Sequence, residues 1–188
     1  MGIGDPLRVL LEGRPGIGKS TLTRRLIALL RDAGIPLGGF VTDEIRTRGR
    51  RAGFAVETVR GDRGVLAHVE LAGPPRVGRY GVDLPTFERI ALPALVAPAP
   101  DGVVVVDELG RMELASAAFR AAVSALLDQD VRLVATVQLH HHPFTDALKG
   151  RRDVRLLRVS ERSRDALPER LAAELRTDCA AGWAAEGG

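Results

Sequence analysis

The sequence predicts an α/β fold in which helices flank a largely parallel sheet, and three observations support this prediction. A short apolar strand, Leu7–Leu11, is followed by a glycine-rich loop and an amphipathic helix. A continuous β-branched run, Val103–Val106, is typical of a strand that helices bury on both faces. Between them, three strand-like runs separated by turns predict an antiparallel meander at about residues 39–72. We therefore expect one domain over residues 1–188, with the meander as an insertion.

The loop Gly13–Ser20 matches the phosphate-binding pattern G-x-x-x-x-G-K-[ST] at each fixed position. Glycines let backbone amides point inward around a polyphosphate, and the helix behind the loop adds free N–H groups and its positive dipole end. Lys19 would reach the β- and γ-phosphates, and Ser20 would offer its hydroxyl to Mg²⁺. The alternative, a chance glycine-rich turn, does not account for the full match in this context. The predicted nucleotide-binding residues here are Gly13, Arg14, Pro15, Gly16, Ile17, Gly18, Lys19, Ser20 and Thr21.

Lysine usage is a further indication that Lys19 has a specific role. Of the 27 Lys and Arg residues, only Lys19 and Lys149 are lysine. Arginine is a planar fork and lysine is a point charge on a thin stem, so the two do not substitute freely in a narrow phosphate-binding loop.

Length and composition restrict the class of protein. The 188 residues, 45% hydrophobic and 27% charged, are typical of a soluble globular domain. No apolar run approaches the about 18 residues that span a bilayer, and no signal segment is recognisable, so we expect a cytoplasmic protein without membrane contact. A lone Cys179 excludes an internal disulfide and a cysteine-based metal cluster. A monomer is the favoured oligomeric state.

The densest basic cluster comprises Arg46, Arg48, Arg50 and Arg51, whereas the net charge is only +3. A solvated hairpin tip explains the cluster, and a nucleic-acid patch is the alternative. Aromatic residues for base stacking are sparse here, so a nucleic-acid partner is possible but unsupported.

The strand Val103–Val106 ends in Asp107 and Glu108. An apolar strand ending in an acid, downstream of a phosphate loop, resembles the second nucleotide motif, Walker B, whose acid holds Mg²⁺. A second carboxylate directly after it suits a base that orients the attacking water. Two exposed acids at a strand end are the alternative, and the phosphate loop makes that alternative weaker.

The remaining elements follow from periodicity and turn signals. Thr136 or Gln138, at the end of a strand, could sense the γ-phosphate or could be a polar terminus without ligand contact. His140–His142 is expected to form a loop rather than a metal site, because three consecutive histidines do not share one face. The expected strands are 38–46, 53–59, 65–71, 131–138 and 154–159; the helices are 22–30, 84–95, 114–127 and 167–177; a loop covers 74–81; and a frayed tail covers 180–188, in which Trp183 could dock.

At this point the chain resembles a known family, the small P-loop nucleoside triphosphatases first described from thermophiles, with a human cancer-related member. The resemblance covers roughly Leu7 to Leu167. The stretches that carry it are Gly13–Ser20, Gly39–Thr42 with Glu44 and Arg46, Gly49–Phe54, Val77–Val82 and Val106–Leu114.

The resemblance implies a RecA-like core of parallel strands. It also implies Mg²⁺-dependent hydrolysis of several nucleoside triphosphates with little base preference. Two departures stand out, because the family usually has lysine where this chain has Arg111, and often has Asn-Arg where this chain has Ser163-Arg164. The second departure puts base contacts in doubt. The second motif is predicted to bind nucleotide through Asp107, Glu108, Leu109, Gly110, Arg111, Met112 and Glu113.

The resulting hypothesis is an NTPase in which Lys19, Glu108 and Arg111 act in catalysis, while Ser20 and Asp107 bind Mg²⁺. Arg111 would neutralise transition-state charge, with Arg46 and Arg79 as alternatives. A small-molecule or nucleoside kinase on the same fold is the second hypothesis. A nucleotide-dependent binding module is the third.

Overall fold

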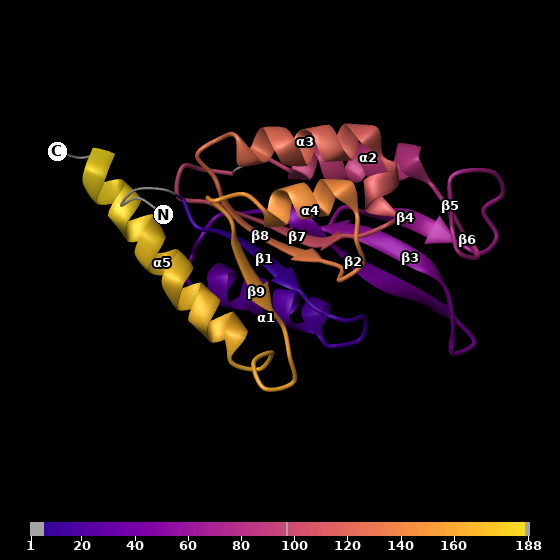
Figure 1. Cartoon of the computed structure of the whole chain (residues 1–188), viewed down its shortest axis with the longest axis horizontal. Helices are drawn as coiled ribbons and strands as arrows, with labels where there is room; N and C mark the ends of the chain where they lie inside the picture. Colours follow the sequence, from indigo (N-terminus) through magenta and orange to yellow (C-terminus); the bar gives the residue numbers. More distant parts are fainter. Residues whose placement is uncertain (1–5, 97, 187–188) are drawn as a thin grey trace.

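The computed structural model describes the backbone of residues 6–96 and 98–186, and the side chains of these residues as far as Thr177. Within them, one nine-stranded sheet has the order β5-β6-β4-β3-β2-β7-β8-β1-β9 (Figure 1). Its strands are β1 Arg8–Glu12, β2 Leu37–Thr47, β3 Arg50–Thr58, β4 Arg63–His68, β5 Arg76–Val77, β6 Tyr80–Val82, β7 Val103–Leu109, β8 Arg132–Val137 and β9 Arg155–Arg158. The helices are α1 Lys19–Asp32, α2 Leu84–Ala94, α3 Ala117–Leu127, α4 Pro143–Lys149 and α5 Leu167–Glu186, with a 3₁₀ turn at Glu113–Ala115.

The sheet has a parallel half and an antiparallel half that share β2. Residues Leu37–Val41 of β2 pair in parallel with β7, and Phe40–Thr47 pair antiparallel with β3. At the junction Gly39 has φ 99°, and a Cβ there would lie 1.9 Å from the carbonyl oxygen of Val105. Only glycine allows β2 and β7 to approach this closely. The predicted meander is therefore an extension of the core sheet.

In the parallel half, β8 lies between β1 and β7. The phosphate-loop strand and the acidic strand are thus separated by one strand. In register, Glu12 pairs with Val137 across β1 and β8, and Val41 pairs with Asp107 across β2 and β7. Because these strands are parallel, their carboxyl ends meet at one edge, where α/β sheets bind ligands.

Helices cover both faces of the sheet (Figure 1). Leu22 and Leu26 of α1 and Leu171 of α5 pack on one face, next to Val9 and Leu11 of β1. On the other face α2 and α3 bring together three fully buried rings, with centroids 5.1–5.7 Å apart, on Phe40, Phe87 and Phe119.

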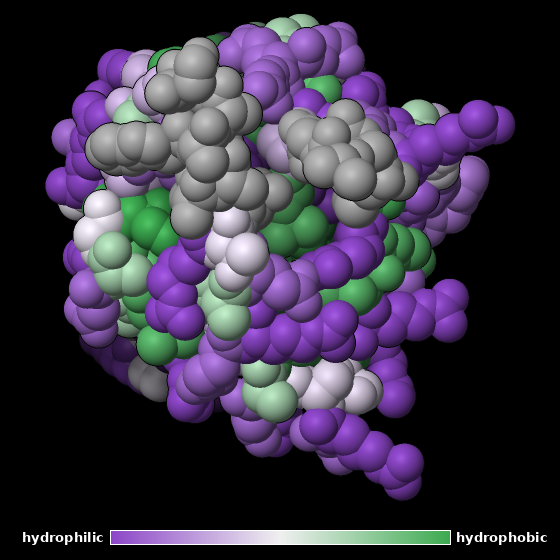
Figure 2. All heavy atoms as spheres, turned by 90° about the vertical axis from the view of Figure 1, so that its left-hand side faces the viewer, coloured by the Kyte–Doolittle hydropathy of each residue, from purple (hydrophilic) through white to green (hydrophobic). Residues whose placement is uncertain are grey.

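Figure 2 shows the end of the molecule that lies at the left in Figure 1. In the part formed by described residues, hydrophobic side chains occupy separate recesses between hydrophilic ones. None of the described helices is long and apolar enough to cross a bilayer.

Two local predictions were wrong, one helix was not predicted, and another helix extends further than predicted. The loop predicted at 74–81 contains the β5–β6 hairpin, whose strands are too short for a periodic signal. The helix predicted at 114–127 is split, because the Ser116 hydroxyl accepts a hydrogen bond from Phe119 N and caps α3. Helix α4 was not predicted. Helix α5 continues past Thr177 to Glu186 through an alanine-rich segment with high helix propensity, so most of the predicted frayed tail is helical. The predicted docking of Trp183, and residues 187–188, lie outside what the structure describes.

Candidate active site

The phosphate loop connects β1 to α1 at the carboxyl edge of the sheet. Gly18 is the N-cap of α1 with φ 104°, a left-handed conformation that favours glycine. No side chain caps this helix start. Its first N–H groups therefore remain available for an anion, and the helix dipole adds a favourable potential there.

Lys19 joins the two predicted motifs. Its side chain is 7% exposed, and its ammonium donates a hydrogen bond to the carbonyl oxygen of Gly13 at 3.0 Å. The same nitrogen lies 3.4 Å from Oε2 of Glu108. One cation thus contacts both the start of the loop and the second acid of β7.

Asp107 is buried with one oxygen satisfied and one free. Oδ1 accepts a hydrogen bond from the Thr136 hydroxyl at 2.5 Å, whereas Oδ2 has no partner among the described residues. Burial raises the pKa of the Asp107 carboxyl, against smaller opposing effects of Thr136, Ser20, Lys19 and Arg24. A buried, unpaired carboxylate oxygen beside a serine hydroxyl fits a hard divalent cation such as Mg²⁺, which prefers oxygen ligands. The residues present therefore fit the predicted metal.

Glu108 is closer to solvent, with 32% of its side chain exposed. Burial raises the pKa of its carboxyl, Lys19 opposes this shift, and the neighbouring Asp107 adds to it. A carboxylate with a raised pKa, partly open to solvent and next to Lys19, suits a base that accepts a proton from water.

Glu113, which is also predicted to bind nucleotide, is buried close to Glu108. Burial, reinforced by the charge of Glu108, raises the pKa of Glu113 to about 8. A Cβ at Gly110 would lie 2.8 Å from Oε2 of Glu113 and 2.9 Å from Oε1 of Glu108. Glycine at this position therefore lets the two carboxyl groups flank the same Cα.

The other predicted residues of the second motif point in different directions. The side chain of Leu109 is fully buried in the core, and Met112 packs against the same cluster. Contacts with a nucleotide would therefore involve their backbone. Arg111 is exposed in the turn after β7.

The two alternative arginines are occupied elsewhere. Arg46 pairs with Glu44 and donates to the carbonyl oxygen of Gly49. The guanidinium of Arg79 donates to the carbonyl oxygen of Arg51 and lies 5.1 Å from the Tyr80 ring centre. Neither has a contact with Lys19 or Glu108 among the interactions of the described residues.

Arg24 is a cation near the site that the sequence analysis missed. Its guanidinium pairs with Oδ1 of Asp43 at 2.5 Å. Its charge partly opposes the effect of burial, which raises the pKa of Asp107. The signal was present in the spacing, because Arg24 follows Ser20 by four residues and so shares its helix face.

A hollow of about 660 Å³ opens beside the phosphate loop. The loop's own residues form one side, and Leu139 with the segment after β9 forms the other. The Arg164 guanidinium donates a hydrogen bond to the carbonyl oxygen of Ile17 in the phosphate loop, at 3.3 Å. The volume suits a nucleoside.

Two of the three consecutive histidines have local roles. Nδ1 of His142 accepts a hydrogen bond from Phe144 N and caps α4, and His141 pairs with Asp146. The part of the chain described contains no group of three potential metal-binding His, Cys, Asp or Glu residues.

Comparisons with known proteins place this geometry in a family. A family model described as NTPase matches residues 8–172. This chain belongs to the NTPase family.

The relatives of this NTPase span bacteria, archaea and humans. Nucleoside-triphosphatase THEP1 of Thermotoga petrophila is 39% identical over 86% of this chain and 88% of its own. The same-named protein of Methanothermobacter thermautotrophicus is 42% identical over 85% and 90%. The human cancer-related nucleoside-triphosphatase is 39% identical over 85% and 91%.

Two solved structures confirm the fold of the NTPase. The crystal structure of THEP1 from Aquifex aeolicus superposes with a TM-score of 0.80 at 29% identity, covering 90% of this chain and 99% of the other. The solution structure of the human protein gives 0.79 at 36% identity, covering 91% and 98%. The predicted family and the predicted P-loop α/β fold are both confirmed.

Proposed function

We propose that this protein hydrolyses nucleoside triphosphates to diphosphate and phosphate, with Mg²⁺ and with broad tolerance of the base. The observation that carries the proposal is the placement of Lys19, 3.4 Å from Glu108 and within hydrogen-bond distance of the loop backbone. The family relationship supports a nucleoside-triphosphatase, which is a hydrolase.

In the proposed mechanism, the free N–H groups at the start of α1 and the ammonium of Lys19 bind the phosphates. Ser20 and Asp107 would hold Mg²⁺, which when bound neutralises charge on the phosphate oxygens. Glu108 orients a water molecule for in-line attack on the γ-phosphorus and accepts its proton, while the bond from the γ-phosphorus to the bridging oxygen breaks and the diphosphate leaves. Thr136 keeps the Asp107 carboxylate oriented by occupying Oδ1, which leaves Oδ2 for the metal. Arg111 is proposed to neutralise charge that develops on the transferred phosphoryl group.

Broad base tolerance is supported by the hollow beside the loop. Its wall at and after the end of β9 includes the long, flexible side chains of Arg158, Glu161 and Arg162. Such side chains can adapt to different bases, and no aromatic ring is among the described lining residues. We further propose that the protein acts in the cytoplasm as a monomer. At the β2–β3 tip, Glu44 pairs with both Arg46 and Arg51, which weakens the case for a nucleic-acid partner.

The test is phosphate release from ATP, GTP, CTP and UTP, each with Mg²⁺ and with EDTA, with Lys19→Ala as the inactive control. We expect release from all four that requires Mg²⁺ and is lost in the control. Release only after a hydroxyl-bearing acceptor is added would favour the kinase hypothesis. Nucleotide binding without release under any condition would favour a binding module.

A further inference from the structure

The second lysine of the chain also lies at the phosphate loop. Lys149, the last residue of α4, has a side chain that is 13% exposed. Its ammonium lies 2.7 Å from Oε1 of Glu12 and donates to the carbonyl oxygen of Gln138 at 3.1 Å. A third oxygen, Oδ1 of Asp146, lies 3.9 Å away. The chain uses lysine twice, and both ammonium groups contact the segment Glu12–Gly13.

Glu12 is the last residue of β1 and directly precedes Gly13. Its side chain is 8% exposed, and its second oxygen lies 3.4 Å from Nε of Arg158. Its carbonyl oxygen accepts a hydrogen bond from Val159 N at 2.7 Å. The start of the phosphate loop is thus tied to the ends of the strands on either side, β8 and β9.

Gln138 directly follows β8, two residues after Thr136, which holds Asp107. The Lys149 ammonium therefore spans two strand ends. One carries the phosphate loop, and the other orients the acid proposed to hold the metal.

We propose that Lys149 is a positioning residue that fixes the phosphate loop relative to the carboxyl end of β8. The proposal rests on the proposed role of this loop in nucleotide binding. Lys149 touches neither the loop amides nor the carboxylate of Asp107, so it acts through Glu12 and Gln138. Displacement of a binding group by about 1 Å can cost up to about 100-fold, which makes such a tie consequential.

Lysine, rather than arginine, is required by the shape of the site. Glu12 and Gln138 converge on one small ammonium from different strands, and a guanidinium presents its donors in a flat fork. At Lys19 and at Lys149, oxygens from different segments meet one ammonium nitrogen.

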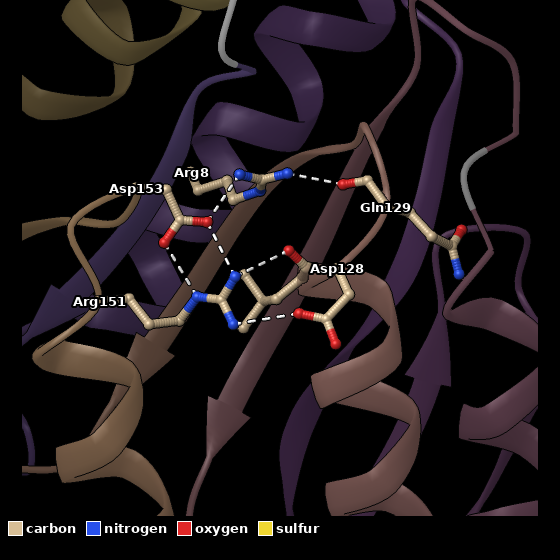
Figure 3. A network of polar contacts seen from close by, with 6 residues as sticks. Arg8, Asp128, Gln129, Arg151 and Asp153 are labelled. Atoms are coloured by element: carbon tan, nitrogen blue, oxygen red, sulfur yellow. Dashed lines mark hydrogen bonds and ion pairs between the residues drawn. The ribbon is translucent and has the colours of Figure 1, made fainter. Parts of the chain in front are cut away.

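The same strand offers a matched control at its other end. Arg8, the first residue of β1, pairs with Asp153 at 2.9 Å, and their side chains are 9% and 29% exposed. Figure 3 shows this pair with Arg151, which also binds Asp153 and reaches Asp128. This network lies far along β1 from the loop, so breaking it affects stability without displacing the loop.

The experiment compares wild type, Lys149→Met, Lys149→Arg and Asp153→Asn. Calorimetry gives the Kd for MgADP, steady-state assays give KM and kcat for MgATP, and thermal scans give Tm. We expect both Lys149 variants to raise Kd and KM by about 10- to 100-fold, with a smaller effect on kcat. Asp153→Asn should lower Tm and leave Kd and KM within about twofold of wild type.

Wild-type Kd for MgADP in Lys149→Met overturns the proposal, whatever the Tm. Wild-type behaviour of Lys149→Arg overturns the requirement for a compact charge. If Lys149→Met does not fold, Glu12→Gln with Lys149→Met removes both charges, and it should fold yet bind MgADP weakly. If wild type binds MgADP but releases no phosphate from MgATP, the proposed hydrolysis fails. The comparison of Kd values for MgADP still decides the role of Lys149. Absence of MgADP binding by wild type overturns both.

Discussion

Two groups of carboxyl groups lie at opposite ends of the parallel strands, and their electrostatic environments differ. Near the start of β1, Asp153 accepts hydrogen bonds from Arg151 and Arg8 (Figure 3), and the Arg151 contact is the main reason that its pKa is lowered. At the carboxyl edge, burial raises the pKa values of Asp107, Glu108 and Glu113. We call Asp153 with its two arginines the basal network. The three acids at the carboxyl edge are called the catalytic cluster, after their proposed role.

The difference shows how one residue type serves two purposes. In the basal network, arginine satisfies the carboxylate within the protein, so the charge contributes to stability. In the catalytic cluster, the ammonium of Lys19 is shared between Glu108 and the carbonyl oxygen of Gly13. Oδ2 of Asp107 has no hydrogen-bond partner among the described residues. Incompletely neutralised acids are typical of sites where a ligand brings the missing cation.

The largest expected effect comes from removing the base in the catalytic cluster. Glu108→Gln keeps the size of the side chain and removes the proton acceptor, so kcat for MgATP should fall about 100-fold or more. The Kd for MgADP should change little. Asp153→Asn, which also removes one carboxylate, should retain wild-type kcat. Phosphate release at the wild-type rate by Glu108→Gln would show that the assigned base is incorrect.

The next effect concerns the pH dependence of stability without nucleotide or Mg²⁺. The pKa of Glu113 rises from 4.5 to about 8 in the folded protein, so its neutral form is favoured by folding. Its contribution to stability is complete below pH 4.5 and is lost as pH rises towards about 8. Glu113→Gln should remove this loss. Urea unfolding of wild type and Glu113→Gln at pH 5, 6.5 and 8.5 measures this loss. If the free energy of unfolding changed with pH in the same way for both proteins, the raised pKa of Glu113 would be contradicted.

The smallest effect is expected in the basal network. Asp153→Asn leaves the nearly buried Arg8 without its ion-pair partner, which should lower the free energy of unfolding by about 1–2 kcal/mol, or a few degrees in Tm. Because the pKa of Asp153 is lowered, its contribution is present above pH 3.8 and is lost as pH falls through the folded value. The slope is therefore opposite to that of Glu113. Thermal scans of wild type and Asp153→Asn between pH 3 and 7 measure this dependence. An unchanged Tm of the variant at pH 7 would show that the ion pair does not contribute to stability.

Short-range patterns predicted the centre of the site from the sequence. The glycine loop and the acidic strand end are each contained in a few consecutive residues, and the fold brings Lys19 and Glu108 together as expected. Spacing on α1 contained the signal for Arg24, which was overlooked.

Long-range contacts could not be predicted in the same way. Glu12 and Lys149 are separated by 137 positions, and no periodicity links them. The burial of Glu113 depends on how the turn after β7 folds back over Gly110. The β5–β6 hairpin was missed because strands of two and three residues carry no alternation.

The position of β1 also has a consequence for how the chain is made. This strand is synthesised before both of its partners, β8 and β9, with Val9 opposite Val134 and Arg155. At about 5–20 residues per second, synthesis keeps β1 waiting for several seconds before either neighbour exists. The loop after β1 therefore has both neighbouring strands in place only once β8 and β9 have been made.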